Sequence, residues 1–165
     1  MEYSFVKYFI LIISLFSIGS SQTNHHYFFS PGVKLGYSFG DNGGFNFGFE
    51  TSLIMTGDYN DDPVYGIVLN YDWIGQMELL HIGFEYSKSV VGIELGPTFD
   101  LQKEERLYGF GITPYIGFLI YPYYHFTYLN DGSVYTGIGS FIKFPIQIDD
   151  NKYSWFRSRR LLSQY

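Results

Sequence analysis

The sequence predicts an all-β protein, a single antiparallel eight-stranded up-and-down transmembrane β-barrel. Three observations lead to this fold class. From Gly32 onward, apolar and polar residues alternate with a period of two, which is typical of strands with two unlike faces. The alternating segments are short, and turn sequences rich in Gly, Asn and Asp separate them. Aromatic residues make up 22% of the chain and charged residues only 16%, against roughly 25% charged residues in ordinary soluble domains.

Length and composition exclude several classes of protein. The 165 residues suffice for one domain. Lys and Arg number 10 against 16 Asp and Glu, so the formal net charge is -6. We therefore expect no nucleic-acid partner, because such a partner requires a concentrated basic face. The chain has no Cys, which excludes disulfides, thiolate metal sites and a cysteine nucleophile.

Residues 1–21 are predicted to be a secretory signal peptide. Lys7 precedes an apolar stretch, and small residues follow that stretch at 19–21, as in signal peptides. An uncleaved anchor helix is the alternative, but the apolar stretch has about 11 residues where a membrane-spanning helix needs roughly 20. We expect cleavage near Ser21, an exported mature chain, and a flexible lead-in over residues 22–31.

The predicted barrel covers residues 32–148. Within it, each alternating segment ends at a glycine-containing or strongly polar turn. The expected strands are 33–39, 45–55, 65–73, 80–86, 91–100, two strands within 108–128, and 134–144. As one strand, the segment 108–128 would be roughly 70 Å long at about 3.3 Å per residue. We place its turn between Pro114 and Pro122, because proline cannot donate to a strand ladder.

The apolar face of each strand is predicted to face lipid. Glycines occupy much of the polar face, and they suit the crowded interior of a narrow barrel better than a soluble exterior. The apolar face carries large rings on strand after strand, and rings that face lipid need no interlocking. Rings with a polar tip occur near strand ends, where membrane barrels have interfacial girdles. These are Tyr37, Tyr71, Trp73, Tyr86, Tyr124 and Tyr128.

With this orientation, the charged and imidazole side chains of the polar face point into the barrel. These are Lys34, Glu50, Asp72, His81, Glu85, Glu94, Asp100, His125 and Lys143. We expect a hydrogen-bonded network that fills the interior, because buried charges must pair. In it, Lys34 and Lys143 would pair with some of the glutamates at 50, 85 and 94. An eight-stranded barrel is only wide enough for its own side chains, which argues against a porin.

No catalytic residues are predicted. His81 and Glu85 lie about 13 Å apart along one strand at about 3.3 Å per residue, too far for a base and its orienting acid. No Ser stands at a telling spacing from His125. An outer-membrane lipid hydrolase or acyltransferase, which would need such a constellation, is therefore the less favoured alternative.

No cofactor and no metal are predicted either. The segment Asp58–Asp62 begins like a calcium loop, but Pro63 and Leu69 stand where Gly and Glu are required. The adjacent pair His25 and His26 does not make a structural metal site.

The signal peptide, the eight short strands and the glycine-rich polar face resemble the small outer-membrane β-barrels of Gram-negative bacteria, of the OmpA/OmpX-like type. The resemblance covers roughly residues 27–148, and the stretches 80–86 and 92–99 are typical of it. It implies an outer-membrane location, periplasmic termini, contact with outer-membrane lipid and insertion by the outer-membrane assembly machinery. A structural or interaction role in the cell envelope follows, and the sequence identifies no surface partner.

Residues 149–165 form a basic and aromatic tail that departs from this resemblance. Such barrels commonly end on a last strand with a terminal aromatic residue, whereas here the tail follows the last predicted strand. We expect a periplasmic extension; alternatively, its bases and rings rest on an anionic membrane surface. For the whole protein, the alternative is a soluble exported barrel or sandwich, such as a lipocalin-like carrier of an apolar ligand.

Overall fold

The computed structural model describes residues 25–40, 43–57, 62–75, 77–102, 107–117 and 119–148. The predicted signal peptide, the lead-in up to residue 24, the turn at 103–106 and the tail at 149–165 lie outside these residues. So do residues 58–61 of the segment that begins like a calcium loop. No helix in the described part of the chain is long and apolar enough to cross a membrane.

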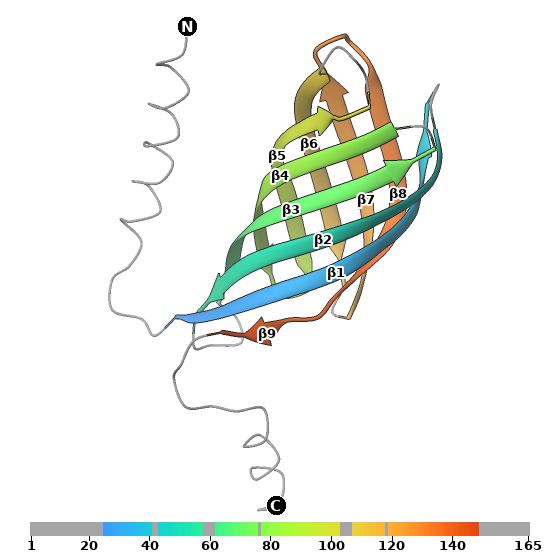
Figure 1. Ribbon diagram of the computed structural model, residues 1–165. Coiled ribbons are helices and arrows are strands. Elements are labelled where there is room, and N and C mark those ends of the chain that lie inside the picture. The colour runs from blue at the N-terminus through green and yellow to red at the C-terminus, as the bar shows by residue number, and fades with distance from the viewer. Residues whose placement is uncertain are drawn as a thin grey trace, which may run out of the picture.

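The described residues form one antiparallel sheet that closes on itself. Its strands are β1 (His26–Phe39), β2 (Gly44–Thr56), β3 (Val64–Ile74), β4 (Met77–Lys88), β5 (Val91–Asp100), β6 (Leu107–Ile116), β7 (Ile120–Leu129), β8 (Val134–Lys143) and β9 (Ile146–Gln147). From β1 to β8, each strand pairs with the next along the chain, and β8 pairs with β1. The predicted eight-stranded up-and-down barrel is therefore confirmed (Figure 1).

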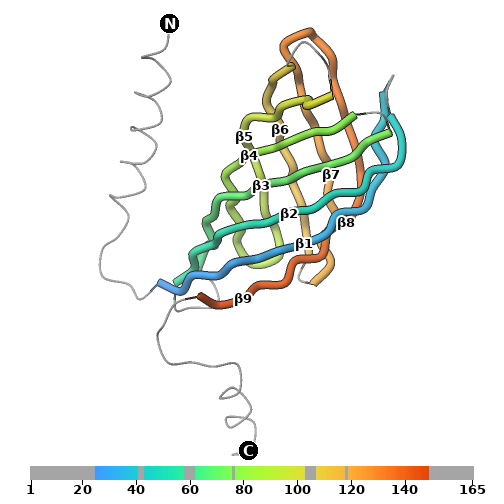
Figure 2. The backbone as a smooth tube through the Cα atoms, in the orientation of Figure 1, coloured from blue at the N-terminus to red at the C-terminus, as the bar shows by residue number. Residues whose placement is uncertain are grey.

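The register of the strands sets the tilt of the barrel wall. One path steps across register pairs from Phe29 through Leu53, Ile67, Phe84, Leu95, Ile112, Phe126 and Thr136. It returns to β1 at Phe39 and not at its starting residue. A closed barrel with such a stagger requires strands tilted by roughly 35–45° to its axis. The oblique course of β1 to β4 in Figures 1 and 2 shows this tilt.

Strand β1 begins earlier than the sequence predicted. Its pairing with β2 starts at His26, so the expected flexible lead-in is wrong for residues 26–31. Three consecutive rings at 27–29 hide the alternation, and Pro31 reads as a break in the sequence. In the structure, Pro31 lies where β8 gives way to β9, and its carbonyl accepts the Phe144 N–H at 2.8 Å. β9 then continues along β1, with Ile146 paired to Phe29.

The turn between β6 and β7 lies between Pro114 and Pro122, as predicted, because β6 ends at Ile116 and β7 begins at Ile120. Gly132, in the turn from β7 to β8, has a φ of 86°, a conformation that favours glycine. This glycine ends the predicted hairpin turn at 130–132.

The inner face is polar at mid-height and apolar near one end. We call the end that holds His26 and Lys143 the terminal end, and the other the opposite end. An apolar cluster lies inside the opposite end and consists of Ile74, Met77, Leu79, Leu107, Leu129 and Tyr135. In the terminal half, Tyr115, Tyr123 and Phe141 pack together against Tyr121. The predicted polar residues lie between and around these two clusters.

Candidate functional site

The structure places all of the predicted interior residues on the inner face of the barrel. Each of the side chains at 34, 50, 72, 81, 85, 94, 100, 125 and 143 is at most 8% exposed. Strand geometry explains this placement, because successive side chains of a strand point to opposite faces. The alternation that turns the rings outward therefore turns these groups inward.

Lys143 joins three carboxylates from three different strands. Its Nζ lies 2.5 Å from Glu50 Oε1 on β2, 2.8 Å from Glu85 Oε1 on β4 and 3.3 Å from Glu94 Oε1 on β5. The Tyr115 hydroxyl donates a further hydrogen bond to Glu85 Oε1 at 2.6 Å. The sequence predicted that the two interior lysines would pair with some of these glutamates, and in the structure Lys143 contacts all three.

Lys34 pairs with Asp72 and not with a glutamate, unlike the sequence-based expectation. Its Nζ donates to Asp72 Oδ2 at 3.0 Å. The register places Gly48 of β2 between the two residues, as the partner of both. A Cβ at position 48 would collide with the Asp72 carboxylate. The glycine thus leaves the space through which Lys34 reaches across a strand.

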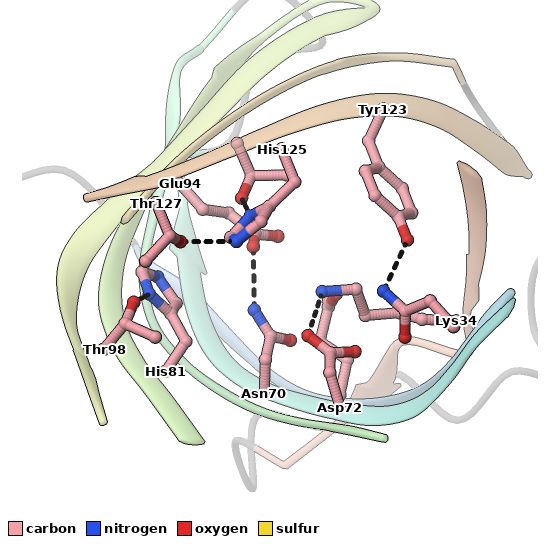
Figure 3. A network of polar contacts seen from close by, with 12 residues as sticks. Lys34, Asn70, Asp72, His81, Glu94, Thr98, Tyr123, His125 and Thr127 are labelled. Carbon is pink, nitrogen blue, oxygen red and sulfur yellow. Dashed lines mark hydrogen bonds and ion pairs between the residues drawn. The ribbon is translucent and has the colours of Figure 1, made fainter. Parts of the chain in front are cut away.

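Uncharged polar residues that the prediction omitted complete the network. The Asn70 Nδ2 donates to Glu94 Oε2 at 3.0 Å, and the Asn46 Nδ2 lies 3.5 Å from the Tyr123 hydroxyl. Figure 3 shows the contact of Asn70 with Glu94 inside the barrel wall, beside the pair formed by Lys34 and Asp72. Both asparagines share the inward parity of their charged neighbours, so the alternation itself was the signal that could have identified them.

The two interior histidines are held by threonine hydroxyls. His81 Nδ1 lies 2.9 Å from Thr98 Oγ1. His125 Nδ1 lies 2.8 Å from Thr113 Oγ1, and its Nε2 lies 2.6 Å from Thr127 Oγ1. The two rings are perpendicular, with centroids 6.4 Å apart. A hydrolytic triad instead places the imidazole between a nucleophile and an orienting acid; here the arrangement fixes the rings between neighbouring strands.

Asp100 lies apart from this network, at the opposite end of the barrel. Its Oδ1 accepts the Gln102 backbone N–H at 3.0 Å, beside the end of β5. Its strand partners are Leu79 and Leu107 of the apolar cluster. The carboxylate therefore stabilises the chain where it leaves the barrel wall, in addition to facing inward.

Among the residues that the structure describes, the candidate metal ligands His25, His26 and Asp62 lie at the terminal end. His25 and Asp62 line one hollow together with Met55, Thr56, Gly57, Pro63 and Tyr65. The ring of His26 lies near Gln147, with 3.4 Å between Nδ1 and Nε2. Among the described residues, no group of three or more His, Cys, Asp or Glu side chains is arranged to hold a metal ion.

Comparisons with known proteins add little to this description. No family model matches the chain, and no curated protein matches it. One solved chain that resembles it belongs to a structure described as "De novo design of transmembrane beta-barrels". The identity is 13%, the match covers 71% of this chain and 95% of that chain, and the TM-score is 0.40. A likeness this weak carries no argument, so the barrel rests on the strand pairing of the chain itself.

Proposed function

We propose that this protein is an outer-membrane β-barrel with a lipid-facing wall, a filled interior and a structural or interaction role in the cell envelope. The observation that carries the proposal is the inverted arrangement of its side chains. The charged groups of the middle of the strands lie inside, and the large apolar groups lie outside. Membrane barrels have this arrangement, and soluble barrels have the reverse.

The outer surface is apolar around the whole wall. At mid-strand, Leu35 is 51% exposed, Ile67 58% and Ile138 51%, and similar side chains occupy the outer face of the other strands. Soluble monomers rarely expose apolar patches above a few hundred Å². A closed wall also leaves no unpaired strand edge, as lipid requires. A surface of this kind therefore favours a bilayer as the surrounding medium.

The height of this apolar surface fits a bilayer. A ten-residue strand is about 33 Å long, and a tilt near 40° reduces this to about 25 Å along the axis, the height of the apolar band in outer-membrane barrels. Tyr37, Trp73 and Tyr128 are exposed towards the opposite end, and Tyr27 and Tyr86 towards the terminal end. Rings at both ends correspond to the interfacial girdles of such barrels.

The outward charges of β4 lie at the two ends of that strand. Glu78, at the opposite end, accepts a hydrogen bond of 2.5 Å from the Tyr71 hydroxyl. Lys88 is exposed at the terminal end. The outward residues between them are Leu80, Ile82, Phe84 and Tyr86. This spacing suits a strand whose ends reach the two polar interfaces of a membrane.

The inner face supports a filled barrel. The Lys143 network and the rings of Tyr115, Tyr123 and Phe141 occupy the terminal half, and the apolar cluster occupies the opposite end. With eight strands, these side chains take up the available width. We therefore propose that the barrel is not a porin, and we propose no catalytic role for it.

Export and assembly belong to the same proposal. The signal peptide at residues 1–21 would direct export, and the outer-membrane assembly machinery would insert the barrel. The membrane lipid is then its principal partner, and the charge of -6 gives no reason to expect nucleic acid as another.

Cell fractionation with gel migration tests this proposal. The full chain is produced in a Gram-negative host, and membrane and soluble fractions are run in SDS with and without heating. We expect the protein in the outer membrane, with faster migration when unheated because a closed barrel stays compact. A soluble product without a heat shift would overturn the proposal. It would make a soluble carrier the better account, to be tested by binding of an apolar fluorescent probe.

A further inference from the structure

The strand ladder of the barrel is interrupted at two places within fully described strands. In the β4–β5 seam, the partners of Ile82 and Gly83 are missing from the ladder, although the pairs on both sides, His81 with Thr98 and Phe84 with Leu95, are formed. In the β6–β7 seam, the ladder breaks between the pair of Ile112 with Phe126 and the pair of Tyr115 with Tyr123. These two seams border the same pair of strands, β5 and β6.

Proline explains both interruptions. Pro97 of β5 and Pro114 of β6 have no backbone N–H to give to a ladder. Inside the β5–β6 pair, both are matched with their partners, Phe110 and Ile93, in an unbroken run from Val91 to Asp100. The missing donors therefore fall on the outer sides of the pair, towards β4 and β7. The ladder between β5 and β6 is therefore unbroken, whereas the ladders that join this pair to β4 and to β7 are each interrupted.

A third proline weakens the β6–β7 seam further. Pro122 of β7 is matched with Ser140 of β8. On its other side, towards β6, the last ladder pair is Tyr115 with Tyr123. In the terminal half of this seam, one ladder pair thus lies between the break and the end of β6 at Ile116.

Each interrupted seam is bridged on its inner side by a bond between a histidine and a threonine. His81 of β4 bonds to Thr98 of β5 at the edge of the first break. His125 of β7 bonds to Thr113 of β6 inside the second break. Gly111 of β6 leaves room for this arrangement, because a Cβ there would lie 2.7 Å from Thr98 Oγ1 and 3.0 Å from His81 Nδ1. Figure 3 shows His81 with Thr98, and His125 nearby.

We propose that the β5–β6 pair is a lateral gate in the barrel wall. The pair moves as one unit, its two outer seams open before any other seam, and the two bonds between histidine and threonine hold them closed. Opening connects the polar interior with the medium around the wall, which is lipid if the protein lies in a membrane. The gate itself rests on the strand pairing, and it holds whether or not the proposed location is correct.

Hydrogen exchange of the wild-type chain tests the order of opening. The folded full-length protein, in vesicles or detergent micelles, is followed by exchange at single-amide resolution. We expect the amides at 82, 84 and 124, which face the interrupted seams, to exchange at least about tenfold faster than those at 49, 51 and 53, which face the unbroken β2–β3 seam, because local opening exposes them. Equal protection of the two sets would overturn the gate.

Two isosteric variants test the bonds that hold it closed. Thr113→Val removes the hydroxyl that joins β6 to His125 across the seam. Thr127→Val removes the other hydroxyl on the same imidazole, which comes from β7 itself and crosses no seam. We expect Thr113→Val to raise exchange of the amide at 124, which faces β6, severalfold above wild type and Thr127→Val to leave it within about twofold. Equal effects of the two variants would contradict the proposed role of the cross-seam bond.

A third variant is expected to strengthen the β6–β7 seam. Its result can be interpreted even if the two threonine variants do not fold. Pro114→Val restores a backbone donor at the break in the β6–β7 seam. We expect slower exchange of the amide at 124 and unchanged exchange at 49, 51 and 53. If the restored donor left the seam as labile as in wild type, the proline would not be the cause of the break and the gate would fail.

Discussion

Lys143 lies on β8 and Glu94 on β5, two strands that do not pair, yet their Nζ and Oε1 atoms are 3.3 Å apart. The same ammonium also contacts Glu50 of β2 and Glu85 of β4. The interior thus contains ion pairs that connect non-neighbouring strands across the barrel, in addition to the backbone ladder between neighbouring strands. Because one cation serves three buried carboxylates, these ion pairs depend on a single side chain.

Replacement of that side chain should destabilise the barrel strongly. Lys143→Met leaves three carboxylates without their cation, and breaking a buried pair in this way costs about 3–5 kcal/mol. Urea unfolding of the reconstituted protein measures the loss. Lys88→Met is the matched control, because Lys88 is exposed on the outer face and such changes stay within about 0.5 kcal/mol. Similar losses for both variants would refute a central role of the buried lysine.

The cost in unfolding free energy of an arginine on the outer face should distinguish a wall that faces lipid from one that faces water. Leu69 is 42% exposed at the middle of β3, and Val134 is 45% exposed at the start of β8. In a bilayer, Leu69→Arg should cost about 2–4 kcal/mol and Val134→Arg about 0–1 kcal/mol, because the cost of a charge depends on depth. Unfolding from vesicles gives both values. On a wet wall, both exposed positions would tolerate arginine equally well.

The alternation of the sequence was sufficient to predict which residues face inward, and it was insufficient to predict their partners. A strand can slide by two residues without turning any side chain to the other face. The pairing of Lys34 with Asp72 depends on that offset, because both are matched with Gly48 only in the observed register. Parity therefore identified the charged interior set, and the register decided which carboxylate each lysine meets.

The omissions of the sequence-based prediction have similar causes. The sequence predicts a lead-in over residues 22–31 because consecutive rings and a proline conceal the period of two. Pairing with β2 and β9 instead makes residues 26–31 part of a strand. Thr98 and Thr113 have the inward parity, but they are uncharged, and the predicted interior set contained only charged and imidazole side chains. Their contacts with His81 and His125 connect different strands, and only the assembled barrel brings such residues together.

Room for the contacts around the two histidines should depend on one glycine. A Cβ at Gly111 would lie 2.7 Å from Thr98 Oγ1 and 3.1 Å from Thr127 Oγ1, so Gly111→Ala should cost about 1–3 kcal/mol through overpacking. At Gly44, the nearest atom to an added Cβ is a backbone carbon at 3.6 Å, an ordinary contact. Gly44→Ala should therefore be neutral or slightly stabilising. Equilibrium unfolding compares the two, and an equal loss at both positions would contradict crowding as the cause.

Because its interior is filled, the barrel should not conduct ions across a membrane. Phe141 is fully buried, and its ring packs on Tyr115, Tyr121 and Tyr123. Wild-type protein in planar bilayers should therefore show no stepwise conductance. Phe141→Ala should cost about 3–5 kcal/mol through the cavity that it leaves. It should still conduct no current, because the apolar cluster around Leu129 occupies the opposite end. Regular steps from the wild type would mean that water passes both layers, and the proposal of a filled barrel would then be wrong.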